Sequence, residues 1–270
     1  KFQKWKKGYI PKKSSGYREI EIFNISEKLV MRMISNHLGD SINKILTKYS
    51  FAFRKKTNRE KAAVSLQKSV IEGYKSGFKA DIEDYFNSID IDNLILLLKG
   101  LFPFEKLVDF VSQWLIFMNE NGVRGLSQGS VLSPMLSNLY LDRFDREISN
   151  LGLRIARFSD DFVILSNDLS IKDEILENVK KILERMNLYL NEKKTEEIIE
   201  GSSMTFLGQL IDRDKIEKFK DRSDDISENW KEVFEDRWAE GIPVYLTCLS
   251  RGVHCDGGYL VVKGINDSEK

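Results

Sequence analysis

The chain has 270 residues, 41% hydrophobic and 31% charged, and equal numbers of acidic and basic residues give it a formal net charge of zero. This composition fits one large or two ordinary globular domains, and the net charge by itself does not indicate a nucleic-acid partner. Two cysteines exclude a disulfide framework, and no apolar run is long enough for a membrane span, so we expect a reduced compartment and no membrane association.

The charges are unevenly distributed along the chain. Residues 1–18 contain only basic charges, whereas residues 224–240 are mostly acidic. The basic residues are Lys1, Lys4, Lys6, Lys7, Lys12, Lys13 and Arg18. We interpret this arm either as a solvated tail or as a contact for phosphate groups.

Hydrophobic periodicity predicts mainly helices in the first part of the chain. After a turn at residues 12–16, alternation of charged and apolar residues indicates a strand at 17–23. Helical spacing follows at 25–46 and at 59–74, on either side of a basic loop at 54–58.

From residue 78 the predicted elements alternate between strands and helices. They are a strand at 78–82, helices at 92–101 and 104–118, a glycine-rich loop at 122–129, a helix at 131–148, strands at 153–158 and 162–166, a helix at 171–186, and strands at 188–191 and 204–211. This order predicts an α+β fold of the ferredoxin-like kind, in which helices cover one face of a sheet.

The C-terminal part has a different composition. Residues 213–241 are polar and are predicted to form a linker or short helix, and strand-like alternation returns at 242–247 and 257–263. Cys248, His254 and Cys255 could be imagined as zinc ligands, but their spacing fits no common zinc finger and a fourth ligand is missing.

Adjacent aspartates, Asp160 and Asp161, lie at the tip of the hairpin predicted between strands 153–158 and 162–166. Tight hairpin turns prefer Asn-Gly or Asp-Gly, and neighbouring carboxylates repel one another, so turn geometry alone does not explain this pair. Asp81 ends the strand at 78–82 and could lie beside Asp160 in a common sheet. Such carboxylates suit Mg²⁺, and a pair of ions at this place could support nucleotidyl transfer.

The sequence resembles the reverse transcriptases of bacterial group II introns and their relatives. The resemblance rests on motifs in matching order between residues 8 and 211. They are Tyr17-Arg18-Glu19-Ile20, Phe51-Ala52-Phe53-Arg54, Asp81-Ile82-Glu83-Asp84-Tyr85-Phe86, Gln128-Gly129 with Ser133-Pro134 and Asn138, Phe158-Ser159-Asp160-Asp161, Leu190-Asn191-Glu192-Lys193-Lys194 and Phe206-Leu207-Gly208. The resemblance implies the fingers and palm of a right-hand polymerase, with fingers at 1–77, palm at 78–212, and a linker or thumb remnant at 213–241.

The resemblance also implies residue roles. Asp81, Asp160 and Asp161 would be catalytic and, with Ile82, would bind two Mg²⁺ ions, or Mn²⁺ in their place. The nucleotide would be bound by Phe86, Gln128, Gly129, Arg18, Lys12, Arg54 and Lys194. Phe86 would exclude a ribose 2′-hydroxyl, and Lys194 would lie near the pyrophosphate and could donate a proton to it. Primer and template would contact Phe158, Ser159, Phe206, Leu207 and Gly208.

Some positions depart from the usual pattern of this family. The hairpin has Phe158-Ser159 where Tyr-Ala is common, Ser127 replaces a usual Pro, and Lys55-Lys56 follow Arg54 where Pro-Gly is usual. None of these changes removes an expected metal ligand, so activity is expected. They indicate a divergent branch of the family rather than a standard intron maturase.

The alternation at 242–270 resembles the first β-hairpins of the CRISPR adaptation integrase, which is known as a fusion to such reverse transcriptases. The implied function is an RNA-directed DNA polymerase in spacer acquisition from RNA, in the cytoplasm of a prokaryote. Its partners would be an RNA template, a DNA or RNA primer, deoxynucleotides, the fused or bound integrase and a small adaptor subunit. The alternatives are a catalytically silent nucleic-acid-binding module that docks an integrase, and a defence or intron-type reverse transcriptase without an integrase.

Overall fold

A computed structural model describes residues 2, 4–11, 17–103, 106–168 and 172–218. The chain divides into one unit of residues 1–3 and 24–221 and another of residues 4–23 and 222–270. The predictions for Lys12, for the possible zinc ligands and for the β-rich segment at 242–270 lie outside the described residues.

The described part of the smaller unit is a hairpin of β1 (Lys6–Pro11) and β2 (Tyr17–Ile22). The strands are antiparallel with Tyr9 opposite Glu19, and the Nζ of Lys7 lies 2.6 Å from the Oε1 of Glu19. The predicted strand at 17–23 is therefore confirmed. The interpretation of the basic arm as a solvated tail is wrong for Lys6–Pro11, whose backbone pairs with β2.

The helices α1 (Ile25–Ile45) and α2 (Arg59–Ile71) follow the predicted ranges to within three residues at each end. Each begins after an asparagine whose side chain accepts a hydrogen bond from the first turn. The Oδ1 of Asn24 accepts from the backbone N–H of Glu27 at 2.8 Å, and the Oδ1 of Asn58 accepts from that of Lys61 at 2.9 Å. These caps satisfy backbone donors that have no partner within the helix.

A four-stranded antiparallel sheet forms the centre of the larger unit, in the order β4-β5-β3-β6. Its strands are β3 (Ser76–Ala80), β4 (Arg154–Phe158), β5 (Asp161–Ser166) and β6 (Glu196–Ile198). The helix α6 (Ser133–Asn150) precedes β4, and α7 (Lys172–Glu184) follows β5. This connectivity and strand order confirm the predicted α+β, ferredoxin-like arrangement. The sequence pattern did not reveal β6, which has only three residues.

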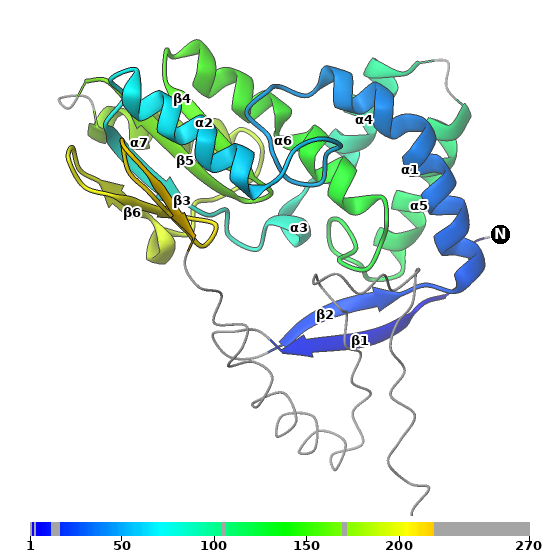
Figure 1. Cartoon of the computed structure of the whole chain (residues 1–270). Coiled ribbons are helices and arrows are strands. Elements are labelled where there is room, and N and C mark those ends of the chain that lie inside the picture. Colours follow the sequence, from blue (N-terminus) through cyan, green and yellow to red (C-terminus); the bar gives the residue numbers. More distant parts are fainter. Residues whose placement is uncertain (1, 3, 12–16, 104–105, 169–171, 219–270) are drawn as a thin grey trace, which may run out of the picture. The chain divides into compact units, whose positions relative to one another are not determined.

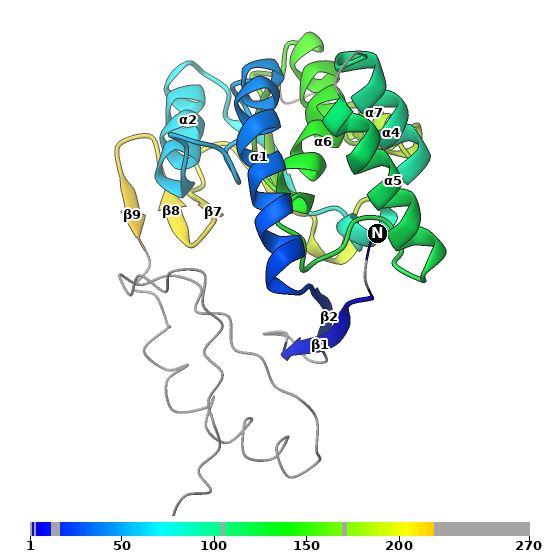
Figure 2. The same cartoon turned by 90° about the vertical axis from the view of Figure 1, so that its right-hand side faces the viewer.

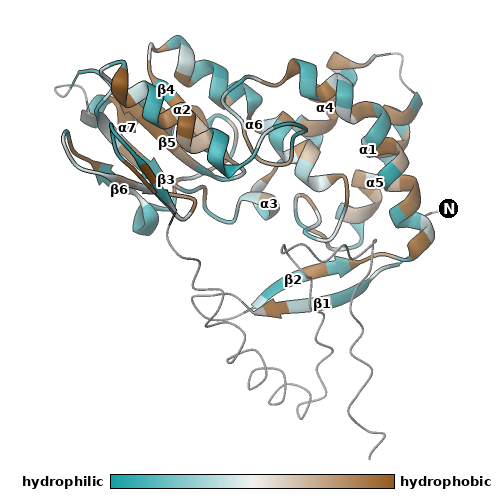
Figure 3. Ribbon diagram, in the orientation of Figure 1, coloured by the Kyte–Doolittle hydropathy of each residue, from teal (hydrophilic) through white to brown (hydrophobic). Residues whose placement is uncertain are grey.

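Both faces of this sheet are covered, which corrects the expectation of helices on one face only. On one face, the ring centroids of Phe162 in β5 and Phe144 in α6 are 5.1 Å apart. On the other, Val163 and Leu165 pack in a cluster with residues of α2, which lies across the sheet (Figure 1). The uninterrupted apolar run of β5, brown in Figure 3, is typical of a strand with two buried faces.

A small antiparallel sheet of β7 (Met204–Phe206), β8 (Gln209–Ile211) and β9 (Ile216–Lys218) lies next to α2 (Figure 2). Met204, Phe206 and Ile211 are buried in the same cluster as Leu66 of α2. The strand predicted at 204–211 is thus a hairpin. Leu207 and Gly208 both have positive φ, as in the two-residue turns that match strand twist.

The remaining elements are α3 (Tyr85–Ser88), α4 (Ile91–Leu101), α5 (Lys106–Glu120) and a short 3₁₀ helix at Glu192–Lys194. The strand predicted at 188–191 is reduced to one isolated bridge between Ile82 and Leu190. Within the described ranges, none of the helices has the length and apolar character needed to cross a bilayer.

Candidate active site

Strand register brings the predicted catalytic aspartates to one end of the central sheet. Ala80 in β3 pairs with Phe162 in β5, so continuing this antiparallel register by one residue places Asp81 opposite Asp161. Asp161 is also paired with Phe158 of β4, which leaves Ser159 and Asp160 as the turn between β4 and β5. Backbone pairing thus brings Asp81 and Asp161 together, although they are about eighty residues apart in the sequence.

The three carboxylates influence one another. Burial, followed by the charge of Asp81, raises the pKa of Asp160 above its ordinary value. Burial, followed by the charges of Asp160 and Asp81, raises the pKa of Asp161 to about 6. Negative charge therefore accumulates at this end of the sheet in partly desolvated surroundings, where it is costly unless a cation compensates it.

Lys194 supplies one such cation. Its Nζ donates a hydrogen bond to the Oδ2 of Asp81 at 2.6 Å, and this bond is the first cause of the raised pKa of Lys194. The segment that carries Lys194 is held beside β3 because the backbone N–H of Asn191 donates to the carbonyl of Asp81 at 2.8 Å. Lys194 was predicted near the pyrophosphate, and its side chain contacts Asp81, one of the predicted catalytic residues.

The donor set fits Mg²⁺ in kind, since hard cations prefer carboxylate oxygens and would offset the mutual repulsion of these groups. Within the described ranges, no three Asp, Glu, His or Cys side chains already surround one point. The ammonium group of Lys194 lies 2.6 Å from the Oδ2 of Asp81, one of the oxygens of this donor set. Ile82, predicted as a further ligand, has a buried side chain and could contribute only its backbone carbonyl.

The glycine-rich loop packs against the helix that carries Phe86. The backbone N–H of Leu126 donates to the carbonyl of Phe86 at 2.8 Å. Gly125 has φ of +59°, and a Cβ there would lie 2.2 Å from the carbonyl oxygen of Phe86. Only glycine permits this approach. The contact places the loop that carries the half-buried Gln128 and Gly129 next to α3 and Phe86. Their predicted roles at the nucleotide require such an arrangement.

Tyr85 attaches α3 to α6. Its hydroxyl donates to the carbonyl of Ser137 in α6 at 2.5 Å, and its ring meets that of Phe86 edge to face at 5.5 Å. The Tyr85 side chain is buried, whereas Phe86 is half-buried. Phe86 is therefore held from one side and keeps a partly accessible surface.

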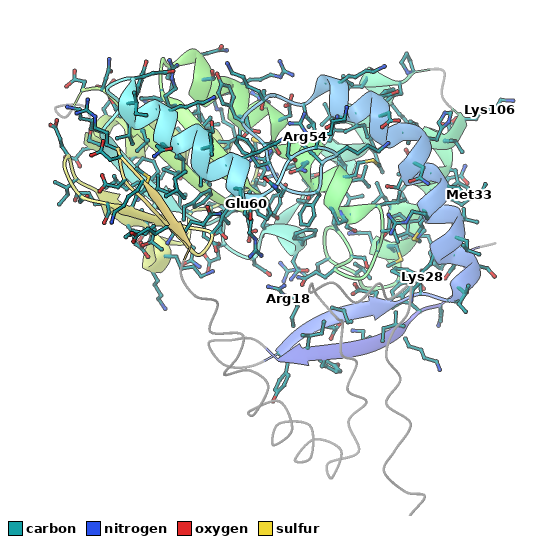
Figure 4. The ribbon with its side chains drawn as sticks, viewed as in Figure 1. Arg18, Lys28, Met33, Arg54, Glu60 and Lys106 are labelled. Atoms are coloured by element: carbon teal, nitrogen blue, oxygen red, sulfur yellow. The ribbon has the colours of Figure 1, made fainter. Side chains whose placement is uncertain are left out.

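Arg54 was predicted to neutralise the triphosphate, but its guanidinium is engaged within the protein (Figure 4). It donates to the Oδ1 of Asn43 at 2.7 Å, to the carbonyl of Asn43 at 3.0 Å, to that of Ser50 at 3.0 Å and to that of Thr47. These bonds tie the loop after α1 to its last turn. The expectation is corrected to a structural role. Arg18 lies in β2, in the other unit, and its nucleotide contact stays a prediction.

The predicted primer and template residues have different surroundings. Phe158 is half-buried with the guanidinium of Arg59 5.8 Å from its ring centroid, and Ser159 forms the turn before Asp160. Phe206 is 1% exposed in the core, so a direct contact of its side chain with nucleic acid is excluded. Leu207 and Gly208 form a turn, and their contact with primer or template stays a prediction.

Sequence reasoning missed the polar groups directly behind the hairpin. Arg157 and Asp145 form an ion pair with both side chains fully buried, at 2.7 Å between Nε and Oδ1. An arginine immediately before Phe158-Ser159-Asp160, in a strand whose other residues apart from Arg154 are apolar, was the available signal. A buried charge needs a specific partner.

Solved structures with a similar fold include telomerases of Candida. The apo telomerase from Candida tropicalis gives a TM-score of 0.58 at 16% identity, covering 82% of this chain and 49% of the telomerase. The telomerase from the same organism in complex with the TWJ fragment of telomeric RNA gives 0.60 at 15% identity, covering 82% and 45%. At this identity the likeness concerns the fold, and it agrees with the palm topology described above.

Similar curated proteins are encoded by introns. The group II intron-encoded protein LtrA of Lactococcus lactis subsp. cremoris is 23% identical over 199 residues, 71% of this chain and 32% of LtrA. The putative COX1/OXI3 intron 2 protein of Saccharomyces cerevisiae is 27% identical over 157 residues, 56% of this chain and 18% of that protein. The chain thus spans a third or less of these relatives.

The model of one protein family matches the greater part of the chain. The match runs over residues 10–211 and includes β2, the glycine-rich loop and the aspartate hairpin. It therefore covers all the motifs on which the resemblance was based, in their order. The chain belongs to the reverse transcriptase (RNA-dependent DNA polymerase) family.

Proposed function

We propose that this protein is an RNA-directed DNA polymerase that extends a primer 3′-hydroxyl on an RNA template. The observation that carries the proposal is the convergence of Asp81, Asp160 and Asp161 at one end of the palm sheet, in a chain of this family. The similarity to a telomerase that binds an RNA fragment and to intron-encoded proteins supports RNA as the template.

Bound Mg²⁺ would supply a lowered pKa at the primer 3′-hydroxyl and charge neutralisation at the leaving pyrophosphate. Asp81, Asp160 and Asp161 are the residues that would hold it. Lys194, which carries a full positive charge beside these groups, would leave Asp81 and neutralise the triphosphate. Phe86 would pack under the deoxyribose, where a 2′-hydroxyl would collide with its ring.

Substitution of Asp160 tests this proposal. We expect Asp160→Asn to abolish primer extension on an RNA template and to lower the affinity for Mn²⁺ measured by calorimetry. Since Asp160 is partly desolvated next to another carboxylate, removing its charge should leave the melting temperature unchanged or raise it. Asp214→Asn, at an exposed acid between β8 and β9, is the control. Extension by the Asp160 variant at the wild-type rate would refute the assignment.

A finer proposal concerns the biological setting. The alternation at residues 242–263 supports a fusion to the CRISPR adaptation integrase, and with it spacer acquisition from RNA, a small adaptor subunit as partner and a prokaryotic cytoplasm. The fingers at 1–77, palm at 78–212 and linker at 213–241 belong to the same proposal. The coding sequence downstream of residue 270 tests it. An integrase reading frame there supports the fusion, and its absence removes the CRISPR role while leaving the polymerase proposal intact.

A catalytically silent docking module is the second candidate. It is favoured by the contact of Lys194 with Asp81, which holds a catalytic oxygen in an ion pair. Titration of labelled template-primer separates the two functions. Binding without extension at saturating Mg²⁺ and deoxynucleotides supports the module, whereas extension supports the polymerase.

A further inference from the structure

Arg157 makes an unusually complete set of contacts for a buried arginine. Its Nε and Nη2 donate to the two carboxylate oxygens of Asp145 at 2.7 and 2.8 Å, and its Nη1 donates to the Oδ1 of Asn138 at 3.1 Å and to the carbonyl of Ser159 at 2.9 Å. Both members of the ion pair have side chains that are 0% exposed. A guanidinium has a rigid fork of donors, so this set of acceptors specifies its position closely.

The contact with Ser159 matters because of the backbone conformation there. Ser159 has φ of 65°, a left-handed value that a residue with a Cβ adopts only at a cost. In a two-residue hairpin turn with positive φ at its first central position, glycine is the usual residue. Asp160 is the next residue, so the hydrogen bond from Arg157 holds the peptide unit that orients Asp160.

The same arginine connects the hairpin to the loop that follows α1. Its backbone N–H donates to the carbonyl of Tyr49 at 2.8 Å, and its carbonyl accepts from the N–H of Phe51 at 2.9 Å. Asn138, which accepts from Arg157, also accepts from the hydroxyl of Ser50 at 3.2 Å and donates to the carbonyl of Ala52 at 2.6 Å. A continuous polar network thus joins α6, this loop and the turn before Asp160.

Stability alone does not account for such a network. An apolar pair of similar volume is often as stable as a buried ion pair or more so, because both charges lose their hydration. Burial by itself would lower the pKa of Arg157, but the charge and hydrogen bonds of Asp145 raise it, so the guanidinium stays protonated. A buried network in which each guanidinium nitrogen of Arg157 has an acceptor is suited to fixing geometry.

We propose that Arg157, held by Asp145 and Asn138, is a positioning residue that fixes the strained Ser159-Asp160 turn and thereby the direction of the Asp160 carboxylate. Arg157 reaches neither substrate nor metal in this role and acts through the peptide unit of Ser159. The consequence for catalysis rests on the proposed polymerase function, whereas the consequence for the turn does not. A small displacement of a catalytic group strongly lowers the rate of the chemical step, so we expect the loss of this support to slow that step.

The double variant Arg157→Leu/Asp145→Leu tests the proposal. It removes both charges together, which avoids leaving one of them unpaired in the core. Arg157→Lys is the second variant, in case the double variant does not fold. A lysine can still pair with Asp145 but lacks the planar fork that reaches Ser159 as well. The matched control is Arg146→Met, which removes the pair of Arg146 with Asp142 on the same helix, at 2.6 Å, and the hydrogen bond of Arg146 to the carbonyl of Ile45, and leaves the bond of Arg157 to Ser159 in place.

The first measurement is amide hydrogen exchange at residues 158–162, which requires no activity. We expect at least about tenfold faster exchange in the double variant and in Arg157→Lys, because both lose the bond to Ser159. Arg146→Met keeps that bond and should exchange at the wild-type rate. Unchanged protection in a folded Arg157 variant would overturn the proposal, whether or not the wild-type protein extends primers.

The second measurement is primer extension as a function of Mg²⁺ and deoxynucleotide. We expect kcat to fall by about tenfold to a hundredfold and half-saturating Mg²⁺ to rise severalfold, with KM for the nucleotide changed less than about twofold. A fall in kcat together with a comparable rise in KM, shared by the control, would indicate a merely structural role and contradict the proposal. An inactive wild-type protein would refute the polymerase function and leave the exchange result to decide the role of Arg157.

Discussion

At the scale of single residues, Lys194 would compete with a bound cation for the Oδ2 of Asp81. We expect Lys194→Met to bind Mn²⁺ severalfold more tightly in the absence of nucleotide, because the variant removes a positive charge 2.6 Å from a ligand atom. The same variant should extend primers more slowly, since it lacks the charge proposed to neutralise the pyrophosphate. Calorimetry with Mn²⁺ and single-turnover extension measure the two effects.

Lys193→Met is the matched control, because Lys193 is the exposed neighbour of Lys194 in the same 3₁₀ helix. It should change ion affinity little, as screened surface charges contribute weakly. Equal ion affinity in Lys194→Met and the wild-type protein would show that the contact with Asp81 does not compete with metal.

The raised pKa of Asp161 predicts a pH-dependent stability. This pKa is about 6 in the folded chain against an ordinary 3.8, so the folded state binds more protons than the unfolded state between these values. The contribution of Asp161 is fully present below about pH 4 and is lost as pH rises through 6. After allowance for solvent screening of this half-exposed group, the loss is on the order of 1 kcal/mol.

Thermal unfolding without divalent ions tests this prediction. Asp161→Asn should melt a few degrees above the wild-type protein at pH 8 and at the same temperature at pH 4. Addition of Mg²⁺ at pH 8 should reverse the order, because a ligand that binds only the folded wild-type site stabilises it. A lower melting temperature of the variant at pH 8 without metal would contradict the repulsion inferred here.

At the scale of elements, the contact between the glycine-rich loop and α3 depends on Gly125. We expect Gly125→Ala to destabilise the protein by about 3 kcal/mol or more, because the new Cβ would lie 2.2 Å from a backbone carbonyl that cannot move freely. Since the loop carries Gln128, KM for deoxynucleotides should also rise. Urea unfolding and steady-state extension measure these changes.

Gly122→Ala separates steric collision from backbone strain in the same loop. Gly122 also has positive φ, +92°, but a Cβ there would meet nothing within 4 Å. Its substitution should cost only about 1 kcal/mol and leave KM unchanged. Equal costs for both variants would mean that the loop does not rest on α3.

At the scale of the whole molecule, the small sheet β7–β9 packs into one hydrophobic core with α2 and the central sheet. Met204, Phe206 and Ile211 are buried in one cluster with Leu66 of α2 and Val163 of the central sheet. Each such side chain stabilises the fold by roughly 2 kcal/mol, against a typical total of about 5–15 kcal/mol. A chain ending at residue 221 should therefore unfold cooperatively, and one ending at residue 202 should not.

Calorimetric melting of the two truncated chains checks this expectation. Because the chain ending at residue 221 keeps the whole cluster, it should also retain Mn²⁺ binding. Cooperative unfolding of the shorter chain with an unchanged melting temperature would show that the small sheet contributes nothing to the palm.

Local sequence patterns were sufficient to predict those elements whose structure is determined within one segment of the chain. The spacing of apolar residues located α1 and α2 to within a few residues. The aspartate pair was assigned to the right hairpin, although the turn is Ser159-Asp160 and Asp161 is the first residue of β5. Three-residue strands such as β6 carry too few residues for a period to be recognised, and β1 was obscured by its basic charges.

Short motifs and local periodicity identified the family, predicted the α+β order of elements and selected the three aspartates as candidate site residues, because these signals lie in consecutive residues. Tertiary structure alone decided the register that sets Asp81 opposite Asp161, the engagement of Arg54 by its own loop and the burial of Arg157 with Asp145. These features depend on residues far apart in the chain, and the free energy of burying a charge or an apolar side chain is defined only once its neighbours are in place.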